Sequence, residues 1–319
     1  MFSELPKLFD RNFAIAFFLP VSLFMVASAW LLNLVGYWSS ISTVFTGDTL
    51  FDITLVVFAS WIVGILLLVL NREIYRFLEG YGDYNPLKLF NERAKQAYKK
   101  KTERLDWLDE NFSDLTTEQR NARTKLMKEL VESYPDKEGL ILPTAFGNAL
   151  RAFEVYPRVM YGFEAIDGWP RILAVLPKDY RELIDDAKAQ VDWWVNLGVM
   201  STFFLIEFWY VIFSKWGLTP AWYYTALNIL LPLGIYVLLN LFLSWRATSA
   251  AIGWGDYVKS AFDIYRFALL ESLGVDTPKN RDEERRLWTR FSQAILFNLP
   301  ESLPDLKKSP RKPVAKKGK

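Results

Sequence analysis

The sequence predicts an all-α integral membrane protein, built as two transmembrane helical hairpins with a helical cytosolic domain between them. Four apolar stretches of about 20 residues are each long enough to cross a hydrocarbon core of about 30 Å. The chain is 51% hydrophobic and 16% aromatic, yet 23% of its residues are charged. The charge lies mainly between the second and third apolar stretches and after the fourth, as expected of a polytopic protein.

The four expected spans are residues 13–35, 50–70, 193–213 and 221–243. Tryptophan and tyrosine residues stand at their ends, where amphipathic rings favour headgroup depth. The loop 39–49 has no Lys or Arg, and the loop after the third span has only Lys215. The other span ends carry basic residues, namely Lys7, Arg11, Arg72, Arg76 and Arg246. The positive-inside rule therefore places both hairpin tips outside and both termini in the cytoplasm of a bacterium, with the spans in its inner membrane.

A cleaved signal peptide is the alternative for the first span, because Ala27-Ser28-Ala29 resembles a signal-peptidase site. Two acidic residues, Glu4 and Asp10, offset the basic residues ahead of the apolar run, which continues through Val35. We therefore expect the first span to be retained.

The cytosolic domain should begin as an extension of the second span. Ile74, Phe77, Leu78 and Tyr81 recur at helical spacing past Leu70, before glycines end the helix. A charged helix is expected over residues 86–112, and its lysines at 99–101 form either a solvated face or an anion site. Thr116, with Gln119 three residues later, predicts the capped start of a helix that continues to Ser133.

Residues 142–176 mix prolines and glycines with apolar side chains, which predicts short helices joined by turns. Pro177 should open a helix that runs through Asp192 directly into the third span. Two further helices are expected over residues 244–273 and 281–299. The expected divisions of the chain are 1–70, 71–192, 193–243, 244–299 and 300–319.

One tetrapeptide occurs twice, as Ile74-Tyr75-Arg76-Phe77 and as Ile264-Tyr265-Arg266-Phe267, each time after a hydrophobic hairpin. Chance is one explanation for four identical residues. A true duplication would instead predict that the two juxtamembrane helices pair in the cytoplasm.

The tail 300–319 is too rich in proline and lysine to build a core. Seven Lys and Arg lie beyond Asp305 with no acidic residue among them. Such a tail can bind anionic lipid at up to about 1 kcal/mol per basic residue, or serve only as a solubilising or positive-inside segment.

Glu207 is the main candidate site residue within the membrane, because no cation lies near it in the third span. A carboxylate at the bilayer centre costs about 2.5–3.5 kcal/mol unless it is protonated, paired or facing water. Asn33, Asn228 and Asn240 are further polar residues at membrane depth. Glu207 should therefore face a pore or a protein interface, and interhelical hydrogen bonds are the alternative role of the asparagines.

Arg151, Arg158 and Arg171 lie in the compact cytosolic segment and are the candidates for binding an anionic ligand such as a nucleotide or oligonucleotide. A salt-bridged structural role is the alternative for each of them.

Catalytic motifs are not evident in the sequence. The chain has no cysteine and no histidine, which excludes thiolate and imidazole chemistry and the usual zinc, haem and iron–sulfur ligands. Asp185 and Asp186 are adjacent on a helix and do not share a face, and no glycine-rich phosphate loop is present. We therefore expect no enzyme, no cofactor and no metal, with a lipid-modifying enzyme as a remote third possibility.

Several motifs resemble a family of bacterial polytopic membrane proteins that has no established activity. They are LPTAFGNALRAFE at 142–154, Tyr161-Gly162, Trp169-Pro170-Arg171, Asn71-Arg72 and Glu79-Gly80-Tyr81. In architecture alone, the chain also resembles Hailong-type channel effectors of anti-phage defence, a resemblance that transfers no site residues.

These expectations combine into a function hypothesis. The leading one is a homo-oligomeric channel or pore controlled by its cytosolic domain, with anti-phage defence as a biological setting. The rival is a membrane-anchored scaffold or assembly factor that binds a cytosolic protein. Both imply the lipid bilayer as a partner, with anionic lipid at the basic tail.

Overall fold

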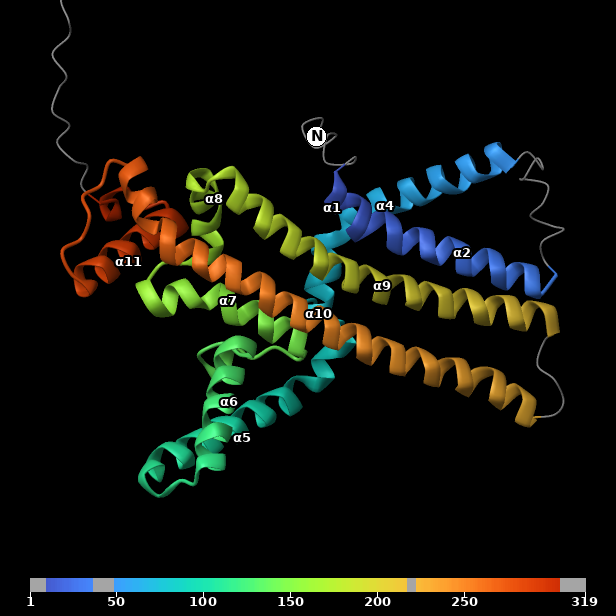
Figure 1. Cartoon of the computed structure of the whole chain (residues 1–319), viewed down its shortest axis with the longest axis horizontal. Helices are drawn as coiled ribbons and strands as arrows, with labels where there is room; N and C mark the ends of the chain where they lie inside the picture. Colours follow the sequence, from blue (N-terminus) through green and yellow to red (C-terminus); the bar gives the residue numbers. More distant parts are fainter. Residues whose placement is uncertain (1–9, 37–48, 217–221, 305–319) are drawn as a thin grey trace, which may run out of the picture.

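The computed structural model describes residues 10–36, 49–216 and 222–304, and every regular element in them is helical. Four helices are long and apolar enough to cross a membrane: Arg11–Leu34, Thr49–Glu79, Lys178–Lys215 and Ala226–Ser272. These helices confirm the helical class and the four candidate spans. They run toward the same end of the molecule, while the other helices gather at the opposite end (Figure 1).

The first hairpin is formed by α1 (Arg11–Phe13), the π-helical turn η2 (Ala14–Phe18), α2 (Leu19–Leu34) and α4 (Thr49–Glu79). The Ala16 carbonyl stands four residues before Pro20, which has no N–H to donate to it. The fully buried Asn196 of α9 (Lys178–Trp216) donates its side-chain amide to this carbonyl at 2.8 Å. The proline in the first span is therefore accommodated by a hydrogen bond from the third.

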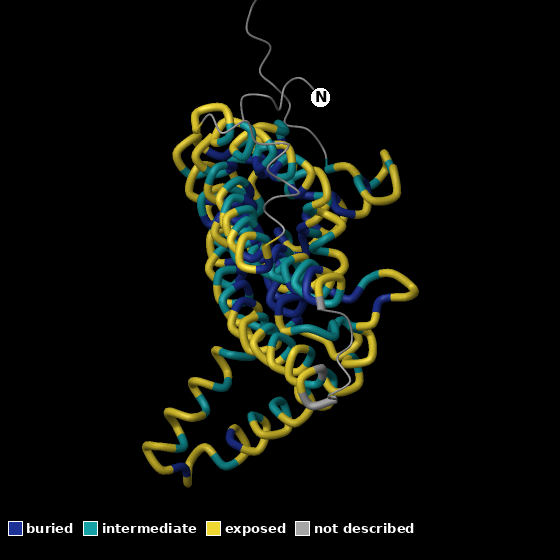
Figure 2. Tube along the Cα trace, turned by 90° about the vertical axis from the view of Figure 1, so that its right-hand side faces the viewer, coloured by how far each residue is buried: buried dark blue, intermediate teal, exposed yellow. Residues whose placement is uncertain are grey.

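α4 ends where the sequence predicts, because Gly80 follows Glu79 with a φ of +94°. The next elements are η3 (Pro86–Phe90), α5 (Asn91–Glu110), η4 (Phe112–Asp114), α6 (Thr117–Ser133) and η5 (Glu138–Leu140). Thr116 and Gln119 form the predicted capping box at the start of α6. α5 and α6 pack together as an arm that projects from the rest of the molecule and is exposed along most of its length (Figures 1 and 2).

The helical body is built from α7 (Ala145–Tyr161), α8 (Ala165–Val175), α11 (Arg281–Phe297) and the body ends of α9 and α10 (Trp222–Ser272), with η6 (Pro300–Ser302) after it. The predicted short helices in 142–176 are α7 and α8. Phe163 and Trp288 are fully buried at its centre and stack with ring centroids 4.3 Å apart. Most of the buried, dark blue segments in Figure 2 lie in the interior of the packed helices, of which this core is one part.

α4, which packs on the body, and α9 and α10, which help to form it, each continue into a candidate span without a break. α9 does so as predicted, and α10 is a single helix of 51 residues where the sequence suggested a span followed by a second helix. The expected chain divisions at 70, 192 and 243 therefore fall inside continuous helices. The tail beyond residue 304 lies outside the described residues.

The pairing of the two juxtamembrane helices that a duplication would predict is not among the main helix contacts of the described residues, where α4 and α10 each pack on α7. The repeated tetrapeptide also takes unlike environments. Arg76 is half exposed and lies 3.7 Å from Glu73, whereas Arg266 is mostly buried and donates to Glu284 at 2.6 Å. The identity of four residues thus carries no structural equivalence.

Candidate functional site

Glu207 lies at the contact between α9 and α2, where it is half-buried. The hydroxyl of Ser28, itself only 8% exposed, donates to Glu207 Oε2 at 2.5 Å. Of the two predicted environments, a protein interface and a pore, the single chain provides the interface.

The three candidate asparagines do not converge with Glu207. Asn240 of α10 donates to Ser201 Oγ of α9 at 3.0 Å and to the Tyr236 carbonyl at 3.1 Å, and the first of these is an interhelical hydrogen bond of the kind that the alternative predicts. Asn33 and Asn228 are exposed on α2 and α10. Of the four candidate residues, Asn240 alone lines either of the two cavities described below.

The three candidate arginines each contact a local partner. Arg151 lies 3.3 Å from Glu154 and also hydrogen bonds to the Tyr81 hydroxyl. Arg158 lies 3.3 Å from Asp136, and Arg171 donates to the Asp167 carbonyl at 2.7 Å. Arg151 and Arg158 thus form ion pairs of the kind that the structural alternative predicts. The contacts do not bring the three guanidinium groups to a common site.

A buried polar cluster around Asp192, at the body ends of α4 and α9, was not predicted. Asp192 is 3% exposed and accepts hydrogen bonds from Tyr75 at 2.7 Å, Asn71 at 3.1 Å and Lys188 at 2.7 Å. The hydrogen bonds of this polar cluster connect α4 to α9 directly beyond the apolar parts of both helices. The sequence analysis gives Asp192 only as the end of a helix. Two of its partners, Asn71 and Tyr75, lie more than a hundred residues away, and no local signal in the sequence indicates them.

A second junction joins the end of α4 to the start of α7. Thr144 caps α7 by accepting from Gly147 N at 3.0 Å, and its hydroxyl donates to the Leu78 carbonyl at 2.7 Å. Pro143 packs directly against Gly80. We call Leu78, Gly80, Pro143 and Thr144 the α4–α7 junction.

Two carboxylates lie beside this junction. Glu79 is 9% exposed, well past Leu70 and so outside the predicted membrane-spanning segment. Burial, and then the charge of Glu154, raise the pKa of Glu79 to about 7, against the influence of Arg151 and Arg76. Burial also raises the pKa of Glu154, which Arg151 partly offsets. The junction therefore favours protonated carboxyl groups.

We expect the stability of the protein to fall as the pH rises from about 4.5 to about 7. In this window the unfolded chain releases the Glu79 proton, whereas the folded chain retains it. Because the folded state then binds more protons than the unfolded state, a rise in pH favours unfolding. The loss should be on the order of 1–2 kcal/mol after allowance for partial solvent access. Thermal unfolding in detergent at pH 5 and pH 7.5 measures it.

Glu79→Gln should flatten this pH dependence, whereas the exposed Glu73→Gln on the same helix should leave it unchanged. An equal dependence in all three proteins would show that Glu79 does not titrate in this window.

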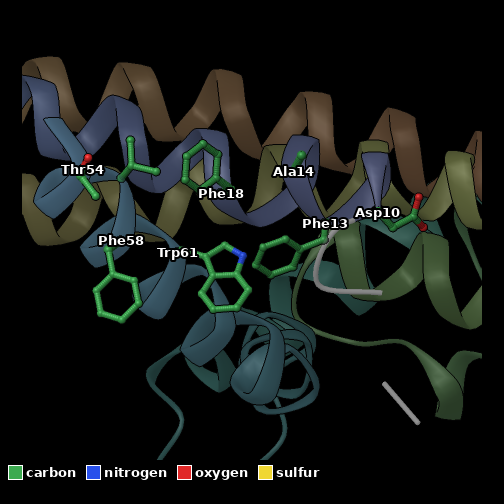
Figure 3. A pocket seen from close by; sticks show the side chains of 8 residues that line it. Asp10, Phe13, Ala14, Phe18, Thr54, Phe58 and Trp61 are labelled. Atoms are coloured by element: carbon green, nitrogen blue, oxygen red, sulfur yellow. The ribbon is translucent and has the colours of Figure 1, made fainter. Parts of the chain in front are cut away.

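Two cavities lie among the helices of the described residues. One of about 540 Å³ lies between the start of the first hairpin and α4, and Figure 3 shows Phe13, Phe18 and Trp61 around it. Its polar side chains are Asp10 and Thr54, and Thr54 already donates to the Leu50 carbonyl. The second cavity is a groove of about 950 Å³ between α4, α7, α9 and α10.

The described residues contain no cluster of acidic side chains that could hold a metal ion. No family model matches the chain, and neither a curated protein nor a solved structure is significantly similar to it.

Proposed function

We propose that the protein is a homo-oligomeric channel of the bacterial inner membrane whose cytosolic helical body controls the packing of its spans. The observation that supports this most is the continuity of α4, α9 and α10 from the body into the apolar segments. A continuous helix transmits a rotation or shift of its body end to its membrane end, because its backbone hydrogen bonds resist bending.

The proposed sidedness places the body in the cytoplasm and the hairpin tips outside. Arg72, Arg76 and Arg246 lie at the body ends of the apolar segments, as the positive-inside rule requires. Both chain ends then belong to the cytoplasmic side. A lipid-facing surface formed by α2, α4, α9 and α10 accounts for their many exposed apolar side chains.

Oligomerisation is supported by polar groups on the outer surfaces of the spans. Asn228 is exposed on α10 within the fourth span, where lipid offers its amide no partner. Glu207 is half exposed at the seam of α2 and α9. Contact with a second protomer would satisfy both groups, and a conduction path between protomers would let Glu207 meet water.

The trigger in this proposal is a cytosolic ligand or protein that contacts the body. An anionic ligand such as a nucleotide at Arg151, Arg158 or Arg171 would have to displace the contacts that these arginines already make. A role in anti-phage defence rests on the likeness in architecture.

Ion flux through liposomes that contain the purified protein tests the channel. We expect Glu207→Gln and Glu207→Ala to change the flux severalfold or more, because a carboxylate on the path sets the local cation concentration. Ser28→Ala, which removes the hydrogen bond to Glu207, should act in the same direction with a smaller effect. Glu182→Gln, at an exposed site in the body part of α9, is the matched control.

Absence of flux at every protein-to-lipid ratio, with nucleotides and bacterial lysate added, would contradict the channel. If both Glu207 variants conduct as the wild type does, the protein is still a channel, but Glu207 does not line its conduction path.

A membrane-anchored scaffold is the second candidate, and the α5–α6 arm favours it. The arm projects from the body and exposes Trp107, Phe112, Met127 and Val131 by 45–58%. Aromatic and methionine side chains of this kind serve as contacts for protein partners. Capture of a stoichiometric cytosolic partner, lost in a Trp107→Ala/Met127→Ala variant and accompanied by no ion flux, would support the scaffold over the channel.

A further inference from the structure

The groove of about 950 Å³ lies where the candidate spans meet the helical body, and we call it the boundary groove. α9 and α10 contribute most of its lining, α4 supplies the facing wall, and the start of α7 closes its body end. Its lining is mainly apolar, with Ile74, Phe77, Val199, Phe203 and Leu243 among the residues that form it. Its size and composition are those of a site for a hydrocarbon group.

Three polar side chains that line the boundary groove, those of Thr202, Tyr236 and Asn240, already have hydrogen-bond partners. Thr202 Oγ1 and the Tyr236 hydroxyl are 2.9 Å apart, and Asn240 donates to Ser201 at 3.0 Å. These contacts hold α9 against α10 and leave few polar groups that a ligand must satisfy. The interior of the groove therefore suits the apolar part of an amphipathic molecule.

A cation stands at the rim of the boundary groove. The guanidinium of Arg246 lies 4.9 Å from the ring centroid of Trp194 and 5.7 Å from that of Trp245, and both rings line the groove. Among the described residues, no carboxylate lies within ion-pair distance of Arg246. The one acidic residue in the lining, Glu73, lies 3.7 Å from Arg76. The rim thus offers an oriented positive charge.

The depth of Arg246 in the membrane identifies the ligand class. Arg246 lies three residues after Leu243, the last residue of the predicted fourth span, and Trp194 is the second residue of the predicted third span. Tryptophan rings at these positions belong at the headgroup level, and an arginine held between two of them would lie beside lipid phosphates. A guanidinium without a carboxylate partner can form charge-assisted hydrogen bonds to a phosphate.

We infer that the boundary groove binds one anionic phospholipid of the cytosolic leaflet, with its phosphate at Arg246 and an acyl chain along α9 and α10. The inference depends on the proposed sidedness of the membrane and is independent of ion conduction. The lipid would occupy the space between α4 and α10, which both pack on α7.

Native mass spectrometry of the full-length protein in detergent tests this inference, with phosphatidylglycerol and phosphatidylcholine of the same acyl chains added in turn. The wild type should retain one phosphatidylglycerol in preference to phosphatidylcholine. Arg246→Gln should lower the retained phosphatidylglycerol about fivefold and leave phosphatidylcholine unchanged, because only the charge contact is removed. Arg72→Gln is the control, because Arg72 is exposed near the same depth, whereas Arg246 lies over the two tryptophan rings of the lining.

A second variant keeps the test independent of the arginine. Ser244 lines the boundary groove and is exposed, so Ser244→Trp should fill the groove and lower the retention of both lipids. Equal retention of the two lipids by the wild type, or equal losses in Arg246→Gln and Arg72→Gln, would overturn the inference. Full retention in Ser244→Trp would overturn it as well. Because the readout is mass, none of these results bears on whether the protein conducts ions.

Discussion

Gly80→Ala is expected to lower the free energy of unfolding by more than about 3 kcal/mol, whereas Gly82→Ala should cost only about 1–2 kcal/mol. Both glycines have positive φ angles, +94° and +97°, so an added Cβ strains the backbone similarly at each. Their surroundings differ sharply. A Cβ on Gly80 would lie 2.2 Å from Pro143 Cγ and 2.8 Å from Pro143 Cδ, while nothing lies within 4 Å of one on Gly82.

Pro143 cannot easily move away from an alanine at position 80. Its ring is rigid, and the next residue, Thr144, both caps α7 and donates to the Leu78 carbonyl. The clash must therefore be relieved by separating the end of α4 from the start of α7. Chemical unfolding of the purified variants in detergent measures the difference between the two glycines.

A third variant checks the physical reason. Pro143→Ala removes the ring atoms that clash, so combining it with Gly80→Ala should recover most of the stability that Gly80→Ala alone loses. Equal losses for Gly80→Ala and Gly82→Ala would mean that backbone strain, rather than contact with Pro143, decides the effect.

This junction also bears on the proposed control of the spans. α4 contacts the body at the α4–α7 junction, at the polar cluster around Asp192, and through the ring of Tyr75, which meets Phe146 of α7 edge-on at 5.4 Å. A variant that opens only the junction leaves α4 attached to α9 through Tyr75 and Asn71. If the body regulates the spans through α4, flux in Gly80→Ala should lose its response to cytosolic factors, and flux in Gly82→Ala should keep it.

Local signals in the sequence were sufficient for most of the helices. The capping box of Thr116 and Gln119, the glycine after α4 and the proline before α9 act within a few residues of their own positions. Apolar runs of span length identified the four long helices for the same reason. These features depend on backbone geometry and composition, both of which a single sequence contains.

The contacts that join distant helices could not be predicted in this way. Asn196 donates to the carbonyl of Ala16, and Ser28 donates to Glu207, across separations of about 180 residues. Nothing in the sequence around Asn196 indicates that its partner is a backbone carbonyl opposite Pro20. The repeated tetrapeptide shows that a shared local sequence also does not predict shared contacts, because Arg76 and Arg266 differ in burial and in partners.

Trp288→Ala should lower the free energy of unfolding by about 3–5 kcal/mol, the cost expected for truncating a large buried aromatic side chain. Trp288 is fully buried in the body core, where it stacks on Phe163 and meets the ring of Phe291 edge-on at 5.7 Å. Its removal would leave a cavity that the surrounding helices cannot close without shifting α11. We expect α11 to become sensitive to proteases in this variant.

Two controls separate packing from other effects of this substitution. Among the described residues, Trp288 Nε1 has no hydrogen-bond partner, so Trp288→Phe loses volume but no hydrogen bond and should cost less than about 1.5 kcal/mol. Phe297, on the same helix and 62% exposed, should tolerate replacement by alanine within about 0.5 kcal/mol. A loss for Trp288→Phe as large as for Trp288→Ala would contradict the packing explanation, because the retained ring fills most of the space between Phe163 and Phe291.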